Sequence, residues 1–247
     1  MKTVLITGAT SGIGKATAIA LADKQYKLIL CGRNQAVLDE LKSTLKTQVH
    51  TCCFDVRDKQ EVFKQINNLP DELKSIDILI NNAGNAHGLA TFDQADLADL
   101  DAMIDINVKG LIYVSKAVLP LMPKNRNSHI INISSIAGKE VYANAAIYCA
   151  SKAAVEALTK GMRIDLLPLG IKVTGVAPGA VETNFSLVRF KGDVDRAAKV
   201  YDGFEPLTGE DIAKTIVDVL ELPENVQIAD VTIFPKAQAS ATNIYRK

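Results

Sequence analysis

The strongest constraint on the fold is a strict alternation of short apolar runs with longer helical patterns. The apolar runs are TVLIT (3–7), KLILC (27–31), VHTCCF (49–54), DILI (77–80), HIINIS (129–134), KVTGVA (172–177) and VTIF (231–234). Helical patterns separate them, for example over 14–24 and 35–46. Strands that alternate with crossover helices form parallel sheets, and runs that are apolar throughout are typical of strands covered on both faces. The sequence predicts a doubly wound α/β sheet of about seven parallel strands.

The domain organisation follows from length and from the lack of internal divisions. No Pro/Ser-rich linker, charge block or repeat divides the 247 residues, so we expect a single domain over 1–247. A cofactor half over about 1–110 would be followed by a catalytic and substrate half over 111–247. The segment over 182–207, between the sixth strand and a helix that begins near Thr208, is longer than a usual connection. We predict that it covers the substrate.

Charge and cysteine content exclude several kinds of partner. The 28 basic and 28 acidic residues cancel, so no net field attracts nucleic acid or an anionic membrane. The first apolar run stops at Gly8, too short for a signal peptide or a membrane span, and we expect a cytoplasmic protein. The four cysteines form no C-x-x-C pair, and the histidines lack metal-site spacing. We predict reduced thiols and no metal.

A glycine-rich loop, TGATSGIGKA, follows the first predicted strand. Glycines let the backbone turn sharply and let a pyrophosphate approach the next helix, whose free N–H groups and dipole favour an anion. The spacing is G-x-x-x-G-x-G, which differs from the G-x-G-x-x-G dinucleotide fingerprint. A tight loop without a ligand is the alternative. The candidate cofactor contacts in this loop are Gly8, Thr10, Ser11, Gly12, Ile13 and Gly14.

The end of the second strand indicates which dinucleotide would bind. An NAD site carries an acidic residue there, whereas this chain has CGRN, with Arg33. Arginine pairs well with a 2′-phosphate, and Lys15 places a second cation in the first turn of the preceding helix, where it opposes the helix dipole unless an anion is near. Together they favour NADP over NAD. Alternatively, both are solvated surface charges.

Tyr148 and Lys152 stand four residues apart in AAIYCASKAAVEAL, a run of otherwise small and apolar residues. On a helix they share one face, about 6 Å apart along the axis. We expect the ammonium to lower the pKa of the phenol from about 10 by ~1–3 units, toward values that suit acid/base catalysis. Ser135, at the end of HIINISS (129–135), would face them across a cleft. A chance surface pair is the alternative.

Taken together, these motifs resemble the classical short-chain dehydrogenase/reductase family over essentially the whole chain. TGATSGIG, NNAG (81–84), DINVKG, NISS, YCASK and PGAVET (178–183) occur in the family's order. The resemblance implies a Rossmann-like fold and a catalytic tetrad of Asn107, Ser135, Tyr148 and Lys152. Ser135 would hold the substrate oxygen, Tyr148 would be the acid/base, and Lys152 would lower its pKa and bind the nicotinamide ribose. Asn107 would position a water, or instead stabilise a helix bend beside Gly110.

The same resemblance assigns further cofactor contacts to this chain. It places an acidic residue and its neighbour beside the adenine, the NNAG run along the adenosine ribose, and the PGAVET segment against the nicotinamide amide. Those residues are Asp55, Val56, Asn82, Ala83, Gly84, Pro178, Gly179, Val181 and Thr183. For Asp55, a purely local role in a turn before a helix from Asp58 is the alternative.

Within the family, the last third of the chain is similar to the NADP-dependent 3-hydroxy acid and serine/allo-threonine dehydrogenases. That similarity implies a small hydroxy acid as substrate. Arg189 would then bind its carboxylate, because an arginine fork fits a carboxylate. Pairing with Asp193 or with a neighbouring subunit is the alternative. His87 follows NNAG near the predicted mouth of the cleft, as a substrate contact or a surface histidine.

Two other functions stay open at the level of sequence. The same tetrad suits an NADPH-dependent 3-oxoacyl-thioester or general carbonyl reductase, which would need an open apolar cleft. A dinucleotide-sensing protein without catalysis needs no acid/base, so the tetrad argues against it. The helical patterns over 97–121 and 142–167 carry more apolar residues than one sheet face requires. That surplus predicts a subunit interface, and the family resemblance implies a homotetramer.

Overall fold

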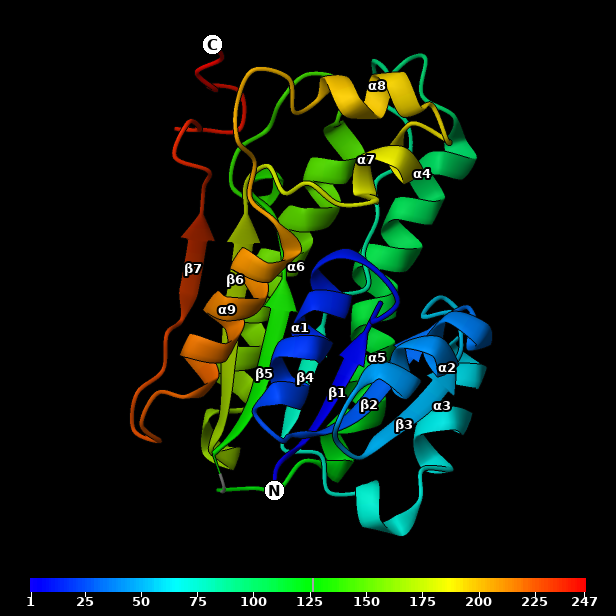
Figure 1. The fold of residues 1–247 in the computed structure, drawn as a ribbon, viewed down its shortest axis with the longest axis vertical. Coiled ribbons are helices and arrows are strands. Elements are labelled where there is room, and N and C mark those ends of the chain that lie inside the picture. The colour runs from blue at the N-terminus through cyan, green and yellow to red at the C-terminus, as the bar shows by residue number, and fades with distance from the viewer. Residues whose placement is uncertain (126) are drawn as a thin grey trace.

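The computed structural model describes residues 1–125 and 127–247 and contains one seven-stranded parallel sheet in the order β3-β2-β1-β4-β5-β6-β7 (Figure 1). The strands are β1 (Thr3–Thr7), β2 (Lys27–Gly32), β3 (Val49–Cys53), β4 (Ile78–Asn81), β5 (Ser128–Ile133), β6 (Ile171–Pro178) and β7 (Asp230–Ile233). Each lies at one of the seven predicted apolar runs, so the predicted doubly wound α/β fold is confirmed.

The strand order creates a crevice at the centre of the sheet. The chain starts at β1, adds β2 and β3 on one side, and then crosses back to place β4 on the other side of β1. Because all strands are parallel, the loops after β1 and β4 leave the same carboxyl edge in opposite directions. Ligands bind at such switch points in this architecture.

The helices are α1 (Gly12–Asp23), α2 (Gln35–Thr44), α3 (Lys59–Asn67), α4 (Leu97–Ile104), α5 (Leu111–Val118), α6 (Ala146–Asp165), α7 (Phe185–Arg189), α8 (Val194–Lys199) and α9 (Gly209–Leu220). A π-helical turn (Asp105–Gly110) joins α4 to α5. Short 3₁₀ turns occupy η1 (Asp71–Leu73), η3 (Leu119–Leu121), η4 (Ile136–Gly138) and η5 (Leu167–Leu169).

Alternate strand residues fill two separate cores, one on each face of the sheet. Val4 and Ile6 point to the face covered by α1, α2 and α9, whereas Leu5 points to the face covered by α3, α5 and α6. All three side chains have no solvent exposure. Since successive strand residues point to opposite faces, a strand buried on both faces must be apolar at every position. The continuous apolar runs therefore have a direct structural cause.

Three predicted segments contain detail that the sequence did not indicate. The helix predicted over 142–167 begins at Ala146, because the residues before it form a turn at positions 143 and 144. The helix predicted over 97–121 is interrupted by the π-helical turn, and such insertions are frequent at functional sites. The segment over 182–207 carries α7 and α8, which stand above the carboxyl edge of the sheet (Figure 1).

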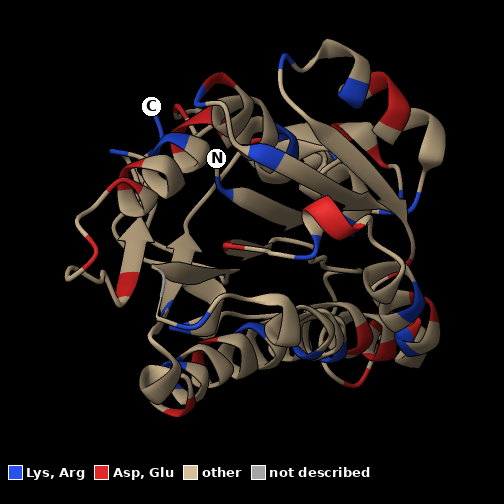
Figure 2. Cartoon of the chain, turned by 90° about the horizontal axis from the view of Figure 1, so that it is seen from below, with Lys and Arg blue, Asp and Glu red and all other residues tan. Residues whose placement is uncertain are grey.

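Charged side chains of both signs are spread over the outer helices and loops, and the strands are almost free of them (Figure 2). This distribution follows from the cost of burying an unpaired charge. No helix in the described ranges is long and apolar enough to cross a membrane.

Candidate active site

A cavity of about 440 Å³ opens at the carboxyl edge of the sheet. Its volume falls within the range of about 300–1,000 Å³ typical of small-molecule sites. Of the predicted site residues, it is lined by Gly8, Thr10, Ser11, Gly12, Ile13, Arg33, Asp55, Val56, Asn82, Ala83, Gly84, Ser135, Tyr148, Lys152, Pro178, Gly179, Val181, Thr183 and Arg189. Gly14 and Asn107 lie behind this lining. Predicted site residues from segments far apart in the sequence therefore line one common cavity.

The N-terminus of α1 has open backbone donors. Ser11 is its N-cap residue and makes no side-chain capping bond, whereas Asn34, Asp58 and Thr208 cap α2, α3 and α9. The first turn of α1 has no acidic residue. Unsatisfied N–H groups and the positive end of the helix dipole favour an anion such as a pyrophosphate.

Glycines allow the loop before α1 to pack closely against the start of α1 and against Asn82. Gly8 and Gly12 have φ of 65° and 50°, a conformation that side chains with a Cβ rarely adopt. A Cβ at Gly14 would overlap the Gly8 carbonyl oxygen and lie 2.5 Å from Asn82 Nδ2. The Asn82 amide in turn donates to the Thr7 carbonyl oxygen over 2.9 Å, which holds the ends of β1 and β4 together. This arrangement fits a dinucleotide cradle.

One part of the cavity wall carries Arg33 and Asp55, and Arg57 lies beside Asp55. Asp55 and Arg57 form an ion pair of 2.8 Å, while Arg33 is exposed at the rim and in none of the ion pairs of the described residues. Burial alone would raise the pKa of Asp55, but hydrogen bonds from Arg57 and the charge of Arg33 hold it below its usual value. Asp55 also accepts a bond from the Arg57 backbone N–H, so the local turn expected for it is present.

Ser135 and Tyr148 both line the large cavity. Ser135 lies two residues beyond β5, where its hydroxyl oxygen accepts a bond from Ala137 N over 3.2 Å. Tyr148 lies in the first turn of α6, is 6% exposed and hydrogen-bonds Ser135. Its ring packs against Phe185 of α7, with 5.7 Å between centroids.

The expectation that Lys152 lowers the pKa of Tyr148 is wrong for the protein alone. Burial raises the pKa of this phenol well above 10, and the neighbouring Tyr142 adds to the effect. The hydrogen bond with Ser135 and the charge of Arg189 act in the opposite direction. Spacing along a helix gives an axial distance but no information about solvent exclusion, which dominates for a buried phenol. Tyr148 therefore keeps its proton at neutral pH.

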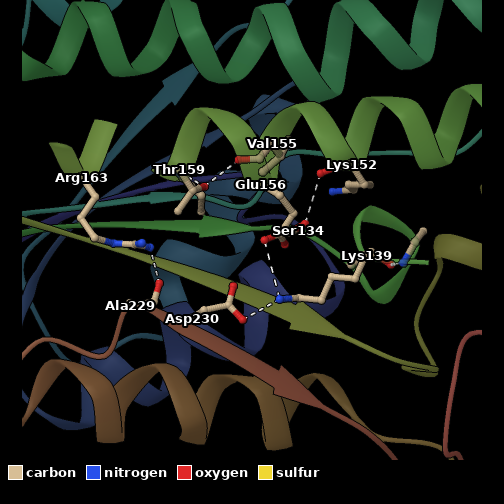
Figure 3. A network of polar contacts seen from close by, with 12 residues as sticks. Ser134, Lys139, Lys152, Val155, Glu156, Thr159, Arg163, Ala229 and Asp230 are labelled. Atoms are coloured by element: carbon tan, nitrogen blue, oxygen red, sulfur yellow. Dashed lines mark hydrogen bonds and ion pairs between the residues drawn. The ribbon is translucent and has the colours of Figure 1, made fainter. Parts of the chain in front are cut away.

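Lys152 is itself buried, and burial lowers its pKa to about 8. Its ammonium donates to the Ile133 carbonyl oxygen over 3.1 Å, and a Cβ at Gly84 would lie 3.1 Å from Nζ. Glu156, one turn further along α6, opposes the shift. Glu156 in turn lies 3.7 Å from the Lys139 ammonium, which forms a 2.6 Å ion pair with Asp230 of β7 (Figure 3).

Asn107 lies in the π-helical turn, with both side-chain polar atoms engaged. Its Oδ1 accepts from Asn85 N over 2.7 Å, and its Nδ2 donates to Asn85 O and to Ser151 Oγ. The side chain thus ties the loop after NNAG to α6. The two roles that the sequence left open, positioning a water and stabilising a bend beside Gly110, stay predictions.

Arg189, at the end of α7, projects over the phenol. Its guanidinium carbon lies 5.4 Å from the Tyr148 ring centroid and 5.7 Å from that of Tyr142. Nη1 donates to the Tyr142 hydroxyl over 3.2 Å, and Nη2 is buried without a partner among the described residues. Pairing with Asp193, the alternative from the sequence, is not observed: Asp193 caps α8 instead.

Among the cavity-lining residues that sequence reasoning missed are Tyr142, Tyr201 and Gln238. The Tyr201 hydroxyl donates to the Val181 carbonyl oxygen over 2.8 Å, and Gln238 Oε1 accepts from Ala180 N over 2.8 Å. No motif or periodicity marked them, because each lies in an irregular segment that only the tertiary fold brings to the cavity. No cluster of three or more potential metal ligands occurs in the described parts of the chain.

Comparison with protein families agrees with this geometry. The model of the short chain dehydrogenase family matches residues 2–192. The chain therefore belongs to the short-chain dehydrogenase family and is an oxidoreductase, as its sequence motifs predict.

Individual relatives match over nearly the whole chain. The NADP-dependent 3-hydroxy acid dehydrogenase of Schizosaccharomyces pombe is 42% identical over 251 residues, covering 100% of this chain and 97% of that protein. Sulfoacetaldehyde reductase 2 of Chromohalobacter salexigens is 42% identical, covering 96% and 95%. A solved structure, the closed form of serine dehydrogenase complexed with NADP⁺, has a TM-score of 0.93 at 40% identity and covers 99% of this chain and 100% of that one.

Proposed function

We propose that this protein is an NADP(H)-dependent oxidoreductase that interconverts a small 3-hydroxy acid and the corresponding 3-oxo acid, with Tyr148 as acid/base. The observation that carries the substrate class is the Arg189 guanidinium, 5.4 Å from the Tyr148 ring, with one buried nitrogen unpartnered. A cation beside the reacting hydroxyl suits a carboxylate, whereas a thioester carrying an acyl chain needs an apolar cleft there. Relatives named for 3-hydroxy acids and serine support the same choice.

The residues present fit NADP(H). The open N-terminus of α1 suits the pyrophosphate, and Arg33 suits the 2′-phosphate. Asp55 and Val56 would line the adenine, and Asn82, Ala83 and Gly84 the adenosine ribose. Lys152 and Tyr148 would hold the nicotinamide ribose, and Pro178, Gly179, Val181 and Thr183 the amide. When bound, NADP(H) supplies the hydride acceptor or donor.

The protein's own part in the reaction is to hold the substrate and to move one proton. Ser135 holds the substrate oxygen, and Arg189 orients the carboxylate. During oxidation, the Tyr148 phenolate takes the hydroxyl proton as the hydride leaves the same carbon. During reduction, the Tyr148 hydroxyl returns that proton to the carbonyl oxygen. Asn107 acts indirectly, since it fixes the Asn85 loop against α6.

Initial rates test the proposal. The purified protein should reduce NADP⁺ with L-serine, L-allo-threonine or 3-hydroxypropionate, and it should do so poorly with NAD⁺. Inactivity with all three acids, together with NADPH oxidation by uncharged ketones or 3-oxoacyl thioesters, would instead support the carbonyl reductase alternative.

Cofactor choice should depend on Arg33. Replacing Arg33 with Ala should lower kcat/KM for NADP⁺ by about 10- to 100-fold and leave kcat/KM for NAD⁺ nearly unchanged, because only NADP⁺ carries the 2′-phosphate. Steady-state kinetics with both cofactors measure the ratio. Lys214→Ala, which removes an exposed cation on α9, is the control. Equal losses with both cofactors would contradict this assignment.

The pH dependence should reflect the raised pKa of Tyr148. Because burial keeps the phenol protonated at neutral pH, oxidation requires loss of that proton and should accelerate as pH rises. The logarithm of kcat/KM should rise with a slope of about 1 along a single apparent ionisation. Reduction uses the protonated phenol and should decline over the same range. An oxidation profile that is flat from about pH 6 to 10 would rule out this role.

We also propose a homotetramer in the cytoplasm. Ile164 at the end of α6 and Leu167 in η5 are 72% and 75% exposed, and Leu97 of α4 is 76% exposed. Large apolar side chains on neighbouring helices suit a helix–helix interface between subunits. Light scattering on the purified protein measures the mass directly, and a monomer would contradict the proposal.

A further inference from the structure

A second, smaller cavity of about 40 Å³ lies beside Tyr148. Its walls come from α4, from the turn that leads into α6, and from the loop that begins at His87. Tyr148 and Arg189 line both this cavity and the large one. The small cavity therefore adjoins the large one at Tyr148, the proposed acid/base.

Two buried nitrogen atoms in residues that line this small cavity have no hydrogen-bond partner in the described chain. They are Nε2 of His87 and Nη2 of Arg189. Buried polar atoms in folded proteins are nearly always paired, because an unpaired one costs about 1–3 kcal/mol and a charged one more. Two such atoms at one cavity, beside the reacting phenol, indicate that a ligand supplies the missing acceptor.

The Arg189 head group is fixed in place by contacts on its other side. Nη1 donates to the Tyr142 hydroxyl, Nε donates to the Gly88 carbonyl oxygen, and the guanidinium packs over two tyrosine rings. The Gly88 backbone N–H donates in return to the Arg189 carbonyl oxygen over 2.9 Å. These bonds join the loop that carries His87 to α7, so the guanidinium and the backbone next to His87 are held before a ligand arrives.

The remaining charges around the cavity are already engaged. Asp99 forms a 2.8 Å ion pair with Lys191, and Asp96 caps α4 through Ala98 N. Burial lowers the pKa of His87, and although Asp99 opposes this shift, the charges of Lys191, Arg33 and Arg57 add to it. His87 is therefore a neutral imidazole at pH 7, which donates one hydrogen bond when the proton is on Nε2. The guanidinium is the uncompensated charge, so the cavity suits an anion.

The size of the cavity limits that anion. About 40 Å³ admits one small group and leaves no room for an acyl chain. Since Tyr148 forms part of the wall, an anionic group in this cavity would lie beside the proposed acid/base.

We propose that His87 and Arg189 together form a subsite for the carboxylate of a short hydroxy acid, with His87 as a specificity-determining residue. The inference rests on the function proposed above and names a second contact for the same substrate. Arg189 donates to the carboxylate from one side and His87 Nε2 donates from the other.

Binding of a substrate fragment tests the subsite separately from turnover. Propionate carries the carboxylate but no hydroxyl, and its affinity for the NADP⁺-loaded protein is measured by calorimetry. His87→Leu should weaken propionate binding about tenfold, the loss expected for one hydrogen bond to a charged group. His87→Gln places an amide N–H near the same position and should restore most of the affinity. Propionamide, which is uncharged, should bind the wild type and both His87 variants with the same low affinity.

Kinetics supply the second measurement. His87→Leu should raise KM for 3-hydroxypropionate about tenfold and change kcat less than about threefold, because His87 binds the carboxylate and moves no proton. His50→Leu, at a partly buried histidine on β3 away from both cavities, is the matched control and should change neither constant.

Each outcome has a distinct meaning. If propionate binding depends on His87 while no hydroxy acid is oxidised, the subsite stands and the proposed reaction fails. If hydroxy acids are oxidised while His87→Leu changes neither KM nor propionate binding, the subsite is wrong. A loss confined to L-serine, with 3-hydroxypropionate unaffected, would also overturn it, because His87 would then contact the amino group. Tighter binding of ethanesulfonate than of propionate would overturn the choice of a carboxylate.

Discussion

Replacing Tyr148 with Phe should lower kcat by about 10²- to 10⁴-fold, the contribution typical of a positioned general acid/base. The phenyl ring keeps the packing against Phe185 and Arg189 and loses only the hydroxyl that bonds Ser135. NADP⁺ affinity should change by less than about tenfold, since one hydroxyl contributes at most one hydrogen bond. Stopped-flow turnover and equilibrium titration of the cofactor measure the two effects separately.

The same variant separates catalysis from sensing. A dinucleotide-sensing protein would show negligible turnover before the substitution and no change after it. Tyr201→Phe is a suitable control, because it also removes one hydrogen-bonded hydroxyl from a residue that lines the cavity. It should retain most of the turnover. Wild-type rates in Tyr148→Phe would show that another group transfers the proton.

Replacing Gly14 with Ala should destabilise the fold by about 3 kcal/mol, the upper end of the usual cost of overpacking, and should weaken NADP⁺ binding sharply. The added Cβ would overlap the Gly8 carbonyl oxygen and press on Asn82 Nδ2. Backbone atoms cannot rotate away as a flexible side chain can, so the glycine loop and α1 must separate. Chemical denaturation gives the free energy of unfolding, and fluorescence titration gives the cofactor affinity.

Gly161→Ala is the matched control for that substitution. Gly161 lies inside α6, and apart from its chain neighbours and the adjacent backbone of its own helix, no atom of the described chain lies within 4 Å of a Cβ built there. Alanine should stabilise this helix by up to about 1 kcal/mol through its higher helix propensity. If both variants showed the same change in stability, the close approach of Gly8 and Gly14 would not be the cause.

The sequence specified the parts of the fold that depend on local pattern. The strands contribute apolar side chains to one or both cores, so continuous apolar runs mark them in the sequence. Asp58 and Thr208 lie at the helix starts that their side chains favour. The start of α6 was placed four residues early because residues 142–145 are compatible with a helix by composition. Only the tertiary fold directs Tyr142 to the cavity rim instead.

The sequence predicted which residues line the site better than it predicted their pKa values. Glycines, Tyr148 and Lys152 have recognisable spacing, and they meet as expected. The direction of the pKa shift at Tyr148 was wrong because desolvation depends on residues such as Phe185 and Tyr142, which come from other segments. The His87 cavity was equally hidden, since it depends on contacts between α4, α6 and α7.

One consequence follows from the contact between Gln238 and the Gly179–Ala180 turn. The wall of the large cavity begins with Gly8 and Thr10, near the start of the chain, and ends with Gln238, Ala241 and Ile244. During synthesis the residues that form β1 to β4 emerge first and can pair, but the cavity is completed only when residues 238–244 have been made and have docked. Ligand binding should therefore stabilise the folded protein by mass action and should give little protection to nascent chains. Cofactor affinity is for that reason a sensitive measure of complete folding.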